Sequence, residues 1–130
     1  MLPEHEIQLR VRYQETDAQG RVHHANYFTY FEMGRVEQLR AAGYDYRKLE
    51  EDGVLMVVYE IGCRYLLPAR YDDVLTLKTM TKRITATRIF HEYEATREGE
   101  VVVKGHSTLA CVGRDGQVQR LPEWMTLEDP

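Results

Sequence analysis

The side chains best suited to chemistry lie close together near the start of the chain. A carboxylate, Asp17, is followed by Gly20 and His24, and Tyr13 precedes it on the same stretch. A carboxylate can attack a carbonyl carbon itself, or it can remove a proton from a water molecule that attacks. This combination favours acyl transfer at a carbonyl group, and it leaves either role open to Asp17.

The secondary structure expected around these residues places Asp17 in a loop. Residues 7–13 alternate apolar and polar, which predicts a half-buried strand, and the polar stretch 15–20 predicts a turn. A helix is expected from residue 26 to about residue 42, with Asn26 as its N-cap. Asp17 then precedes a helix N-terminus, whose free backbone N–H groups can stabilise a developing negative charge.

That helix and the segments after it define the fold class. The helix is apolar around most of its circumference, so we expect it to be largely buried, and Gly43 is expected to end it. Residues 46–51 predict a short helix. Alternation with a period of two predicts further strands over residues 54–65, 74–83, 86–96 and 101–112. Their short connections favour antiparallel neighbours, which predicts an α+β fold with a curved antiparallel sheet.

Two details of the strands can also be predicted. Glu98 and Gly99 are typical of a hairpin turn between the last two long strands. In the strand over residues 54–65, strict alternation predicts a single face that carries Leu55, Val57, Tyr59, Ile61, Cys63 and Tyr65.

Composition narrows the class of protein. The chain has 130 residues and a net charge of −4, which predicts one domain spanning residues 1–130 and argues against a nucleic-acid partner. We find no secretory signal and no stretch long enough to span a membrane, so a cytoplasmic protein is expected. Cys63 and Cys111 lack metal or redox spacing, and His91 and His106 are too far apart in sequence to propose as ligands. We therefore predict no metal.

The chain resembles a known family along most of its length. The matching residues are Tyr13, Asp17, Gly20, His24, Tyr27, Phe31, Glu32 and Arg35, followed later by Tyr65, Pro68, Asp72, Asp73 and Leu75. At this spacing they resemble the 4-hydroxybenzoyl-CoA thioesterase family of the hot-dog fold, especially its short acyl-CoA thioesterase branch. The resemblance implies a five-stranded curved antiparallel sheet wrapped around one long central helix.

The resemblance also implies an activity and an assembly. The expected reaction is hydrolysis of an acyl-CoA thioester to a free carboxylic acid and coenzyme A, without a cofactor. The expected assembly is a homodimer with a continuous ten-stranded sheet, often paired into a homotetramer, with each active site at the dimer interface.

Within the resemblance, each motif residue has an implied role. Asp17 would be the nucleophile or the general base, and the backbone N–H of His24 would bind the oxyanion, an effect worth roughly 3 kcal/mol per donor. The hydroxyl of Tyr13 would fix the carboxylate or the water, and Gly20 would permit the turn. Structural alternatives stay open: an Asx turn for Asp17, packing for Tyr13 and a hydrogen bond to the loop for the side chain of His24.

Other residues are candidates for holding the substrate. Aromatic residues suit an aryl or a short aliphatic acyl group equally well, and the candidates are Tyr27, Phe28, Tyr59 and Tyr65. The side chains of Lys82, Arg83 and Arg88 suit the phosphates of coenzyme A, although an ordinary solvated hairpin would carry the same residues. His23, beside His24, is a weaker catalytic candidate.

Glu32 requires separate treatment, because some hot-dog thioesterases place their carboxylate on the central helix. Arg35 lies one helical turn further on and can pair with it, so we interpret Glu32 as structural.

Two alternative functions are compatible with these residues. One is a thioesterase that acts on acyl carrier protein, which would need a surface for an acidic partner. The other is a non-catalytic module that binds or senses acyl-CoA. Hot-dog hydratases carry a different histidine and aspartate motif.

Overall fold

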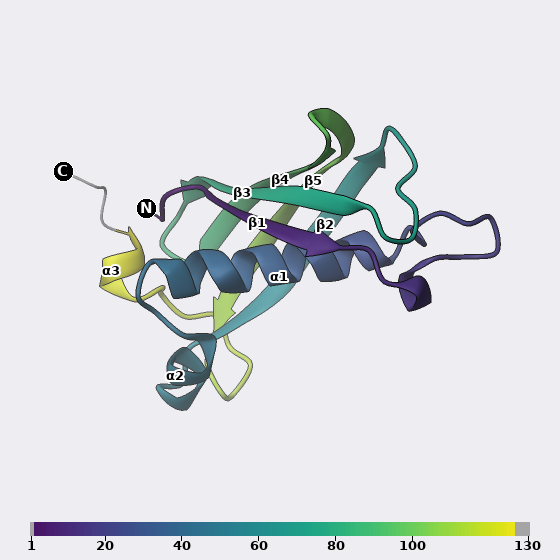
Figure 1. The fold of residues 1–130 in the computed structure, drawn as a ribbon. Coiled ribbons are helices and arrows are strands. Elements are labelled where there is room, and N and C mark those ends of the chain that lie inside the picture. Colours follow the sequence, from purple (N-terminus) through teal and green to yellow (C-terminus); the bar gives the residue numbers. More distant parts are fainter. Residues whose placement is uncertain (1, 127–130) are drawn as a thin grey trace.

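Five strands form one antiparallel sheet, and the long helix lies across one face of it (Figure 1). The structure is a computed structural model and describes residues 2–126. Its elements are β1 (His5–Arg10), η1 (Tyr13–Glu15), α1 (Asn26–Ala41), α2 (Tyr46–Glu51), β2 (Leu55–Tyr65), β3 (Val74–Ile84), β4 (Arg88–Arg97), β5 (Glu100–Val112) and α3 (Glu123–Thr126). The strand order is β1-β3-β4-β5-β2. The predicted α+β class and the hot-dog arrangement are confirmed.

The alternation of β3 and β4 supplies the sheet surface that α1 covers. Leu75, Leu77, Tyr93 and Ala95 are all buried, as their period of two predicts. The turn at Glu98 and Gly99 is also confirmed, because both residues have positive φ, 50° and 81°, as a type I′ hairpin requires.

Helix α1 is buried along one stripe and not all round, so this part of the sequence prediction is wrong. The buried stripe contains Tyr27, Tyr30, Phe31, Gly34, Arg35, Gln38 and Leu39. Met33, an apolar residue on the other side, is 43% exposed.

Two glycines bring the helix close to the sheet, since a Cβ on Gly34 would overlap the hydroxyl of Thr79 and a Cβ on Gly105 would overlap the ring of Phe31.

The predicted single face of β2 is also wrong, because the strand contains a bulge. The pairing with β5 skips Tyr59, between Val58 and Glu60. An extra residue shifts the alternation by one, so every side chain after it points to the opposite face. Met56, before the bulge, and Ile61 and Cys63, after it, consequently all pack against the buried core.

The start of the chain differs from the prediction in two places. Strand β1 ends at Arg10, and Tyr13 lies in the short helix η1 instead of at a strand end. Asn26 is the first residue of α1 and not its N-cap, which is Ala25 and has no side-chain cap bond. The expected short helix at residues 46–51 and the end of α1 near Gly43 are confirmed, with Gly43 at φ 93°.

Strand β2 lies at one edge of the sheet and exposes apolar side chains. Val57 is 43% exposed, Tyr59 62% and Leu66, just beyond the strand, 51%. An edge of this kind offers free backbone donors and acceptors to another strand. Among the helices of residues 2–126, none is long and apolar enough to cross a membrane.

Candidate active site

The loop that carries Asp17 is a tight turn closed by backbone bonds. The Gly20 N–H donates to the Asp17 carbonyl at 2.9 Å, and the Asp17 N–H donates to the Arg21 carbonyl at 2.9 Å. Gly20 has φ 79°, a conformation that costs other residues free energy. The turn predicted for residues 15–20 therefore exists, and a glycine suits its geometry.

The carboxylate of Asp17 is half-buried and only partly used by the loop. Its Oδ1 accepts a hydrogen bond from the Gln19 N–H at 2.8 Å, which forms an Asx turn. No hydrogen bond to Oδ2 occurs within residues 2–126. The turn orients the carboxylate and leaves one oxygen for other partners.

His24 lies immediately before α1, where the backbone changes from loop to helix. Its N–H has no acceptor in the described part of the chain, whereas its carbonyl accepts a hydrogen bond from the Tyr65 hydroxyl at 3.0 Å. The imidazole stacks on that of His23 with ring centroids 4.1 Å apart. The Nδ1 atom of His23 accepts from the Ala25 N–H at 3.1 Å. His24 thus presents a free backbone donor at a helix N-terminus.

A cavity of about 280 Å³ lies beside these two groups. Its lining includes Asp17, His24 and Tyr27 from the predicted set, together with Tyr65. The other lining residues come from the two loops that flank it: Gln19, Arg21, Val22, Leu66, Leu67 and Pro68. Residues far apart in sequence therefore line one small space, among them Asp17, His24 and several apolar side chains.

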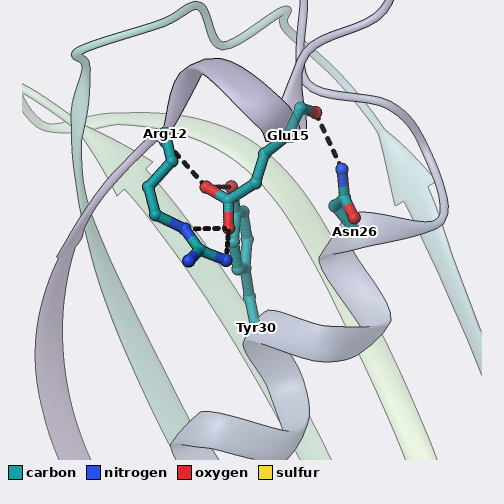
Figure 2. A network of polar contacts seen from close by, with 4 residues as sticks. All are labelled: Arg12, Glu15, Asn26 and Tyr30. Carbon is teal, nitrogen blue, oxygen red and sulfur yellow. Dashed lines mark hydrogen bonds and ion pairs between the residues drawn. The ribbon is translucent and has the colours of Figure 1, made fainter.

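A buried carboxylate next to the Asp17 loop holds that loop in place (Figure 2). Glu15 is 7% exposed, and its Oε1 accepts from the Arg12 N–H at 2.7 Å and from the Tyr30 hydroxyl at 2.9 Å. Its Oε2 accepts from Nε of Arg12 at 3.1 Å. Buried charged groups need such a set of partners to offset their desolvation.

The backbone of Glu15 ties the same loop to the start of α1. Its carbonyl accepts from the side chain of Asn26 at 2.7 Å and from the His23 N–H at 2.8 Å. Asn26 therefore serves as a clamp on the loop and not as the N-cap of the helix. Through Glu15, the loop before Asp17 and the helix start beside His24 form one rigid unit.

The part of the cavity wall formed by residues 66–68 is held by the ion pair between Arg97 and Asp73. Arg97 donates to the Pro68 carbonyl at 2.7 Å and to a carboxylate oxygen of Asp73 at 3.1 Å. Desolvation would raise the pKa of Asp73, but hydrogen bonds from the Arg70 N–H and from Arg97 hold it below the ordinary value. The Val22 N–H donates to the Ala69 carbonyl at 2.8 Å and joins this wall to the Asp17 loop.

Two tyrosines supply the aromatic surface of the cavity. The rings of Tyr27 and Tyr65 meet edge to face at 5.7 Å. Burial raises the pKa of Tyr27 to about 12, and desolvation with nearby Cys63 raises the pKa of Tyr65 to about 12. Both hydroxyls are therefore neutral hydrogen-bonding groups near pH 7.

Tyr13 lies outside this cavity in the structure. It is 77% exposed, and its ring meets that of Tyr71 at 5.6 Å. Its catalytic role stays a prediction.

The basic candidates lie toward the other end of the sheet. Lys82 pairs with Glu92 at 3.6 Å, Arg83 lies 5.0 Å from the centre of the Phe90 ring, and Arg88 lies 4.3 Å from that of Tyr59. Their role as coenzyme A contacts also stays a prediction.

The expected pairing of Glu32 with Arg35 is absent from residues 2–126. Glu32 is exposed, while Arg35 is buried and donates to the Tyr93 hydroxyl at 3.1 Å. Within the same residues, no cluster of three or more metal-binding side chains occurs.

Sequence reasoning missed the contacts by which two residues shape the site. Glu15 is only part of a polar turn in the sequence prediction, although a glutamate three residues after Arg12, beside an apolar helix, is a possible capping signal. Tyr65 belongs to the matching motif and to the aromatic residues suited to an acyl group, but nothing local to it indicates the bond to His24, because the two residues are 41 positions apart.

Comparison with known proteins settles the family. A family model described as the thioesterase-like superfamily matches residues 11–127. The chain belongs to the thioesterase-like superfamily. Its resemblance to the 4-hydroxybenzoyl-CoA thioesterases is confirmed.

Curated and solved thioesterases resemble this superfamily member over most of its length. The acyl-CoA thioesterase YbgC of Haemophilus influenzae is 33% identical over 105 residues, 80% of this chain and 77% of the relative. The solved DHNA-CoA thioesterase of Staphylococcus aureus is 27% identical with a TM-score of 0.90, and covers 94% of this chain and 86% of its own. A solved 4-hydroxybenzoyl CoA thioesterase, 18% identical with a TM-score of 0.85 over 92% and 94%, shows the shared fold alone. The protein is a thioester hydrolase of the acyl-CoA thioesterase type.

Proposed function

We propose that Asp17 and His24 carry out the hydrolysis of an acyl-CoA thioester in the cavity described above. The observation that supports this proposal is the shared cavity, which joins a carboxylate with a free oxygen to a helix-start N–H that has no acceptor within residues 2–126. A thioester carbonyl needs both an attacking group and a donor for its oxygen.

The proposed reaction follows from the positions of these groups. The carbonyl oxygen of the thioester accepts a hydrogen bond from the His24 N–H, and negative charge grows on that oxygen as the carbon is attacked. Either Asp17 attacks the carbon and forms a mixed anhydride that water then hydrolyses, or Asp17 takes a proton from an attacking water. In both routes the carbon–sulfur bond breaks, coenzyme A leaves as a thiolate that gains a proton, and the free acid forms.

The remaining residues support this reaction in distinct ways. Gly20 allows the turn that presents Asp17, and Tyr27 lines the space for the acyl group. Tyr13 stays a candidate for fixing the attacking water. The prediction of a reaction without a cofactor is retained, because each proposed step uses only groups of the protein and water.

Replacing Asp17 by asparagine tests the proposal directly. We expect release of free thiol from a panel of acyl-CoAs to fall about 100- to 10,000-fold, the usual contribution of a general base. Asp115 gives a matched control, because it forms the same kind of Asx turn with the Gln117 N–H at 3.0 Å, away from the cavity. Asp115→Asn should retain full turnover. Retained turnover in Asp17→Asn would remove the basis of the proposal.

We also infer that two copies of the chain pair through β2. Its exposed edge carries Val57 and Tyr59, and pairing would extend the sheet to ten strands while burying this apolar surface. Arg88 lies over Tyr59 on this edge, so this one of the basic candidates would approach the partner subunit.

A charge on this edge tests the inferred dimer. Val57→Lys should shift the protein from dimer to monomer in sedimentation or light-scattering measurements, because it places a charge in an apolar interface. The exposed residue Lys48, on α2, provides a control site, and Lys48→Val should leave the assembly unchanged. A wild-type protein that is monomeric at micromolar concentration would contradict the inference.

A further inference from the structure

Arg35, in the middle of α1, is a buried cation with no anionic partner among the described residues 2–126. It is only 7% exposed, and its Nη1 donates a hydrogen bond to the Tyr93 hydroxyl at 3.1 Å. Within residues 2–126 no carboxylate lies within ion-pair distance of its guanidinium. A buried charge left without a counter-ion costs several kcal/mol, so an arrangement of this kind calls for an anion from elsewhere.

The buried titratable side chains packed around Arg35 are neutral near pH 7. Burial raises the pKa of Tyr93 and of Tyr46, despite the opposing effect of the nearby guanidinium. Burial, with the charge of Arg35, lowers the pKa of His91 to about 3. None of these side chains supplies the missing negative charge.

The guanidinium lines a second cavity, of about 300 Å³, between α1, α2 and the sheet. Its apolar wall is made of Val36, Met56, Val58 and Leu109. Glu32 and Glu50 also line it, but both are solvent-exposed, so water screens their charges more than it screens the buried Arg35. The cavity therefore joins a buried cation to a hydrocarbon surface.

We propose that this second cavity binds a small organic acid, with the carboxylate paired to Arg35 and the hydrocarbon part against the apolar wall. A guanidinium has five N–H donors in a planar fork that matches the two oxygens of a carboxylate. The apolar wall favours an organic acid over a fully hydrated inorganic anion. The volume accommodates an aryl or a short aliphatic acid.

Such a carboxylate has two possible sources, and both rest on the proposed function. It is either the free acid that hydrolysis releases, or a carboxylate at the far end of an acyl group. The second source is suggested by strand β2, which lines both cavities. Its end contributes Tyr65 to the Asp17 cavity, and its first half contributes Met56 and Val58 to the Arg35 cavity. Antiparallel pairing of two β2 strands would place these opposite ends side by side, so that each Arg35 cavity would adjoin the Asp17 cavity of the partner.

Calorimetric titration of the full chain with benzoate and with benzamide tests the site without requiring turnover. The two probes have nearly the same shape, but only benzoate has a charge. We expect benzoate to bind and benzamide to bind about tenfold or more weakly, since a charge-assisted pair is lost. Equal affinity for the two probes, or no binding of either, would overturn the proposal.

Two variants locate the binding site. Arg35→Gln should remove the preference for benzoate, and Val36→Phe, which fills the cavity while keeping Arg35, should weaken benzoate binding about tenfold or more. Val36→Phe guards against an Arg35 variant that fails to fold. Asp17→Asn should bind benzoate as the wild type does. If benzoate binding is lost in Asp17→Asn and kept in Val36→Phe, benzoate binds in the Asp17 cavity, and the proposal is overturned.

A kinetic comparison distinguishes the two sources. If the ligand is the far end of the acyl group, the ratio of kcat/KM for glutaryl-CoA over pentanoyl-CoA should fall about tenfold in Val36→Phe. If the ligand is the free acid, that ratio stays constant and inhibition of the wild type by benzoate is lost in the variant. If the protein hydrolyses neither thioester, that result would contradict the proposed function. The calorimetric titration would still decide whether the Arg35 cavity binds an organic acid.

Discussion

At the scale of single residues, two neighbouring carboxylates have very different surroundings. Glu15 is buried and accepts hydrogen bonds from Arg12 and Tyr30, so both of its oxygens are engaged in holding the loop. Asp17 is half-buried, beside a cavity, with one oxygen that the loop leaves without a hydrogen bond in the described residues. The environment, and not the residue type, separates the positioning role of Glu15 from the chemical role that we propose for Asp17.

Replacing Glu15 by glutamine should therefore affect both stability and catalysis. The glutamine side chain has one acceptor oxygen and cannot accept hydrogen bonds from all the donors that face Glu15. We therefore expect a loss of about 1–3 kcal/mol in the free energy of unfolding. Because the loop that presents Asp17 would shift, kcat should fall about tenfold or more, with a smaller change in KM. Denaturant titration and steady-state kinetics measure the two effects. Glu100→Gln, in an exposed hairpin, is the control, and an unaltered kcat in Glu15→Gln would contradict the positioning role.

At the scale of elements, the contact between α1 and the sheet decides where the Asp17 loop lies. The helix approaches β3 closely at Gly34, where an added Cβ would overlap the Thr79 hydroxyl and lie 2.8 Å from Leu77. The helix start carries His24, and the Glu15 unit joins that start to the loop. Helix position and site geometry are thus coupled through packing.

Gly34→Ala should destabilise the protein even though alanine favours helix formation. The gain in helix propensity is at most about 1 kcal/mol, while forcing a methyl group into a close contact costs about 1–3 kcal/mol. Thermal unfolding should therefore show a lower midpoint for this variant. Thr29→Ala, at an exposed position of the same helix, should change the free energy of unfolding by less than about 0.5 kcal/mol. A Gly34→Ala protein as stable as the wild type would show that the sheet can yield at this point.

At the scale of the whole molecule, a polar layer runs through the interior between α1 and the sheet. Tyr93 bonds to Ser107 at 2.5 Å and accepts from Arg35, and His91 lies beside Tyr93 with its Nδ1 lacking a partner within residues 2–126. The layer contains a fixed positive charge and a histidine that burial keeps neutral. Protonating this histidine would bring a second positive charge into the interior.

The buried histidine predicts that stability falls in acid. Its pKa is about 3 in the folded protein against an ordinary value of 6.5, so between these pH values the unfolded chain binds a proton that the folded chain does not. The stabilisation that comes from the neutral buried His91 is fully present above pH 6.5 and is lost as the pH falls toward 3. In this range the free energy of unfolding falls with a slope approaching about 1.4 kcal/mol per pH unit. Denaturant titrations across this range should show a shallower slope for His91→Gln than for the wild type, and no such change for His106→Gln, whose side chain is 56% exposed.

The elements could be predicted from sequence wherever the signal is local. Alternation identified β3 and β4 because their buried residues follow a strict period of two, and the turn at Glu98 and Gly99 follows from its residue types. The same alternation failed in β2, since the bulge at Tyr59 depends on pairing with β5. The helix prediction overestimated burial because apolar residue type alone does not show which side faces the sheet: the buried stripe includes Arg35 and Gln38, whereas Met33 lies on the exposed side.

The sequence by itself determined the fold class, the position of Asp17 before a helix start and the family resemblance, because residue types at fixed spacing encode them. Only the tertiary structure decided that Glu15 anchors the loop, that Tyr65 holds the carbonyl of His24 and that Arg35 is buried with no counter-ion in the described part of the chain. These facts depend on contacts between residues distant in sequence. Such contacts form only when the sheet and the helix pack together, and no local pattern records them.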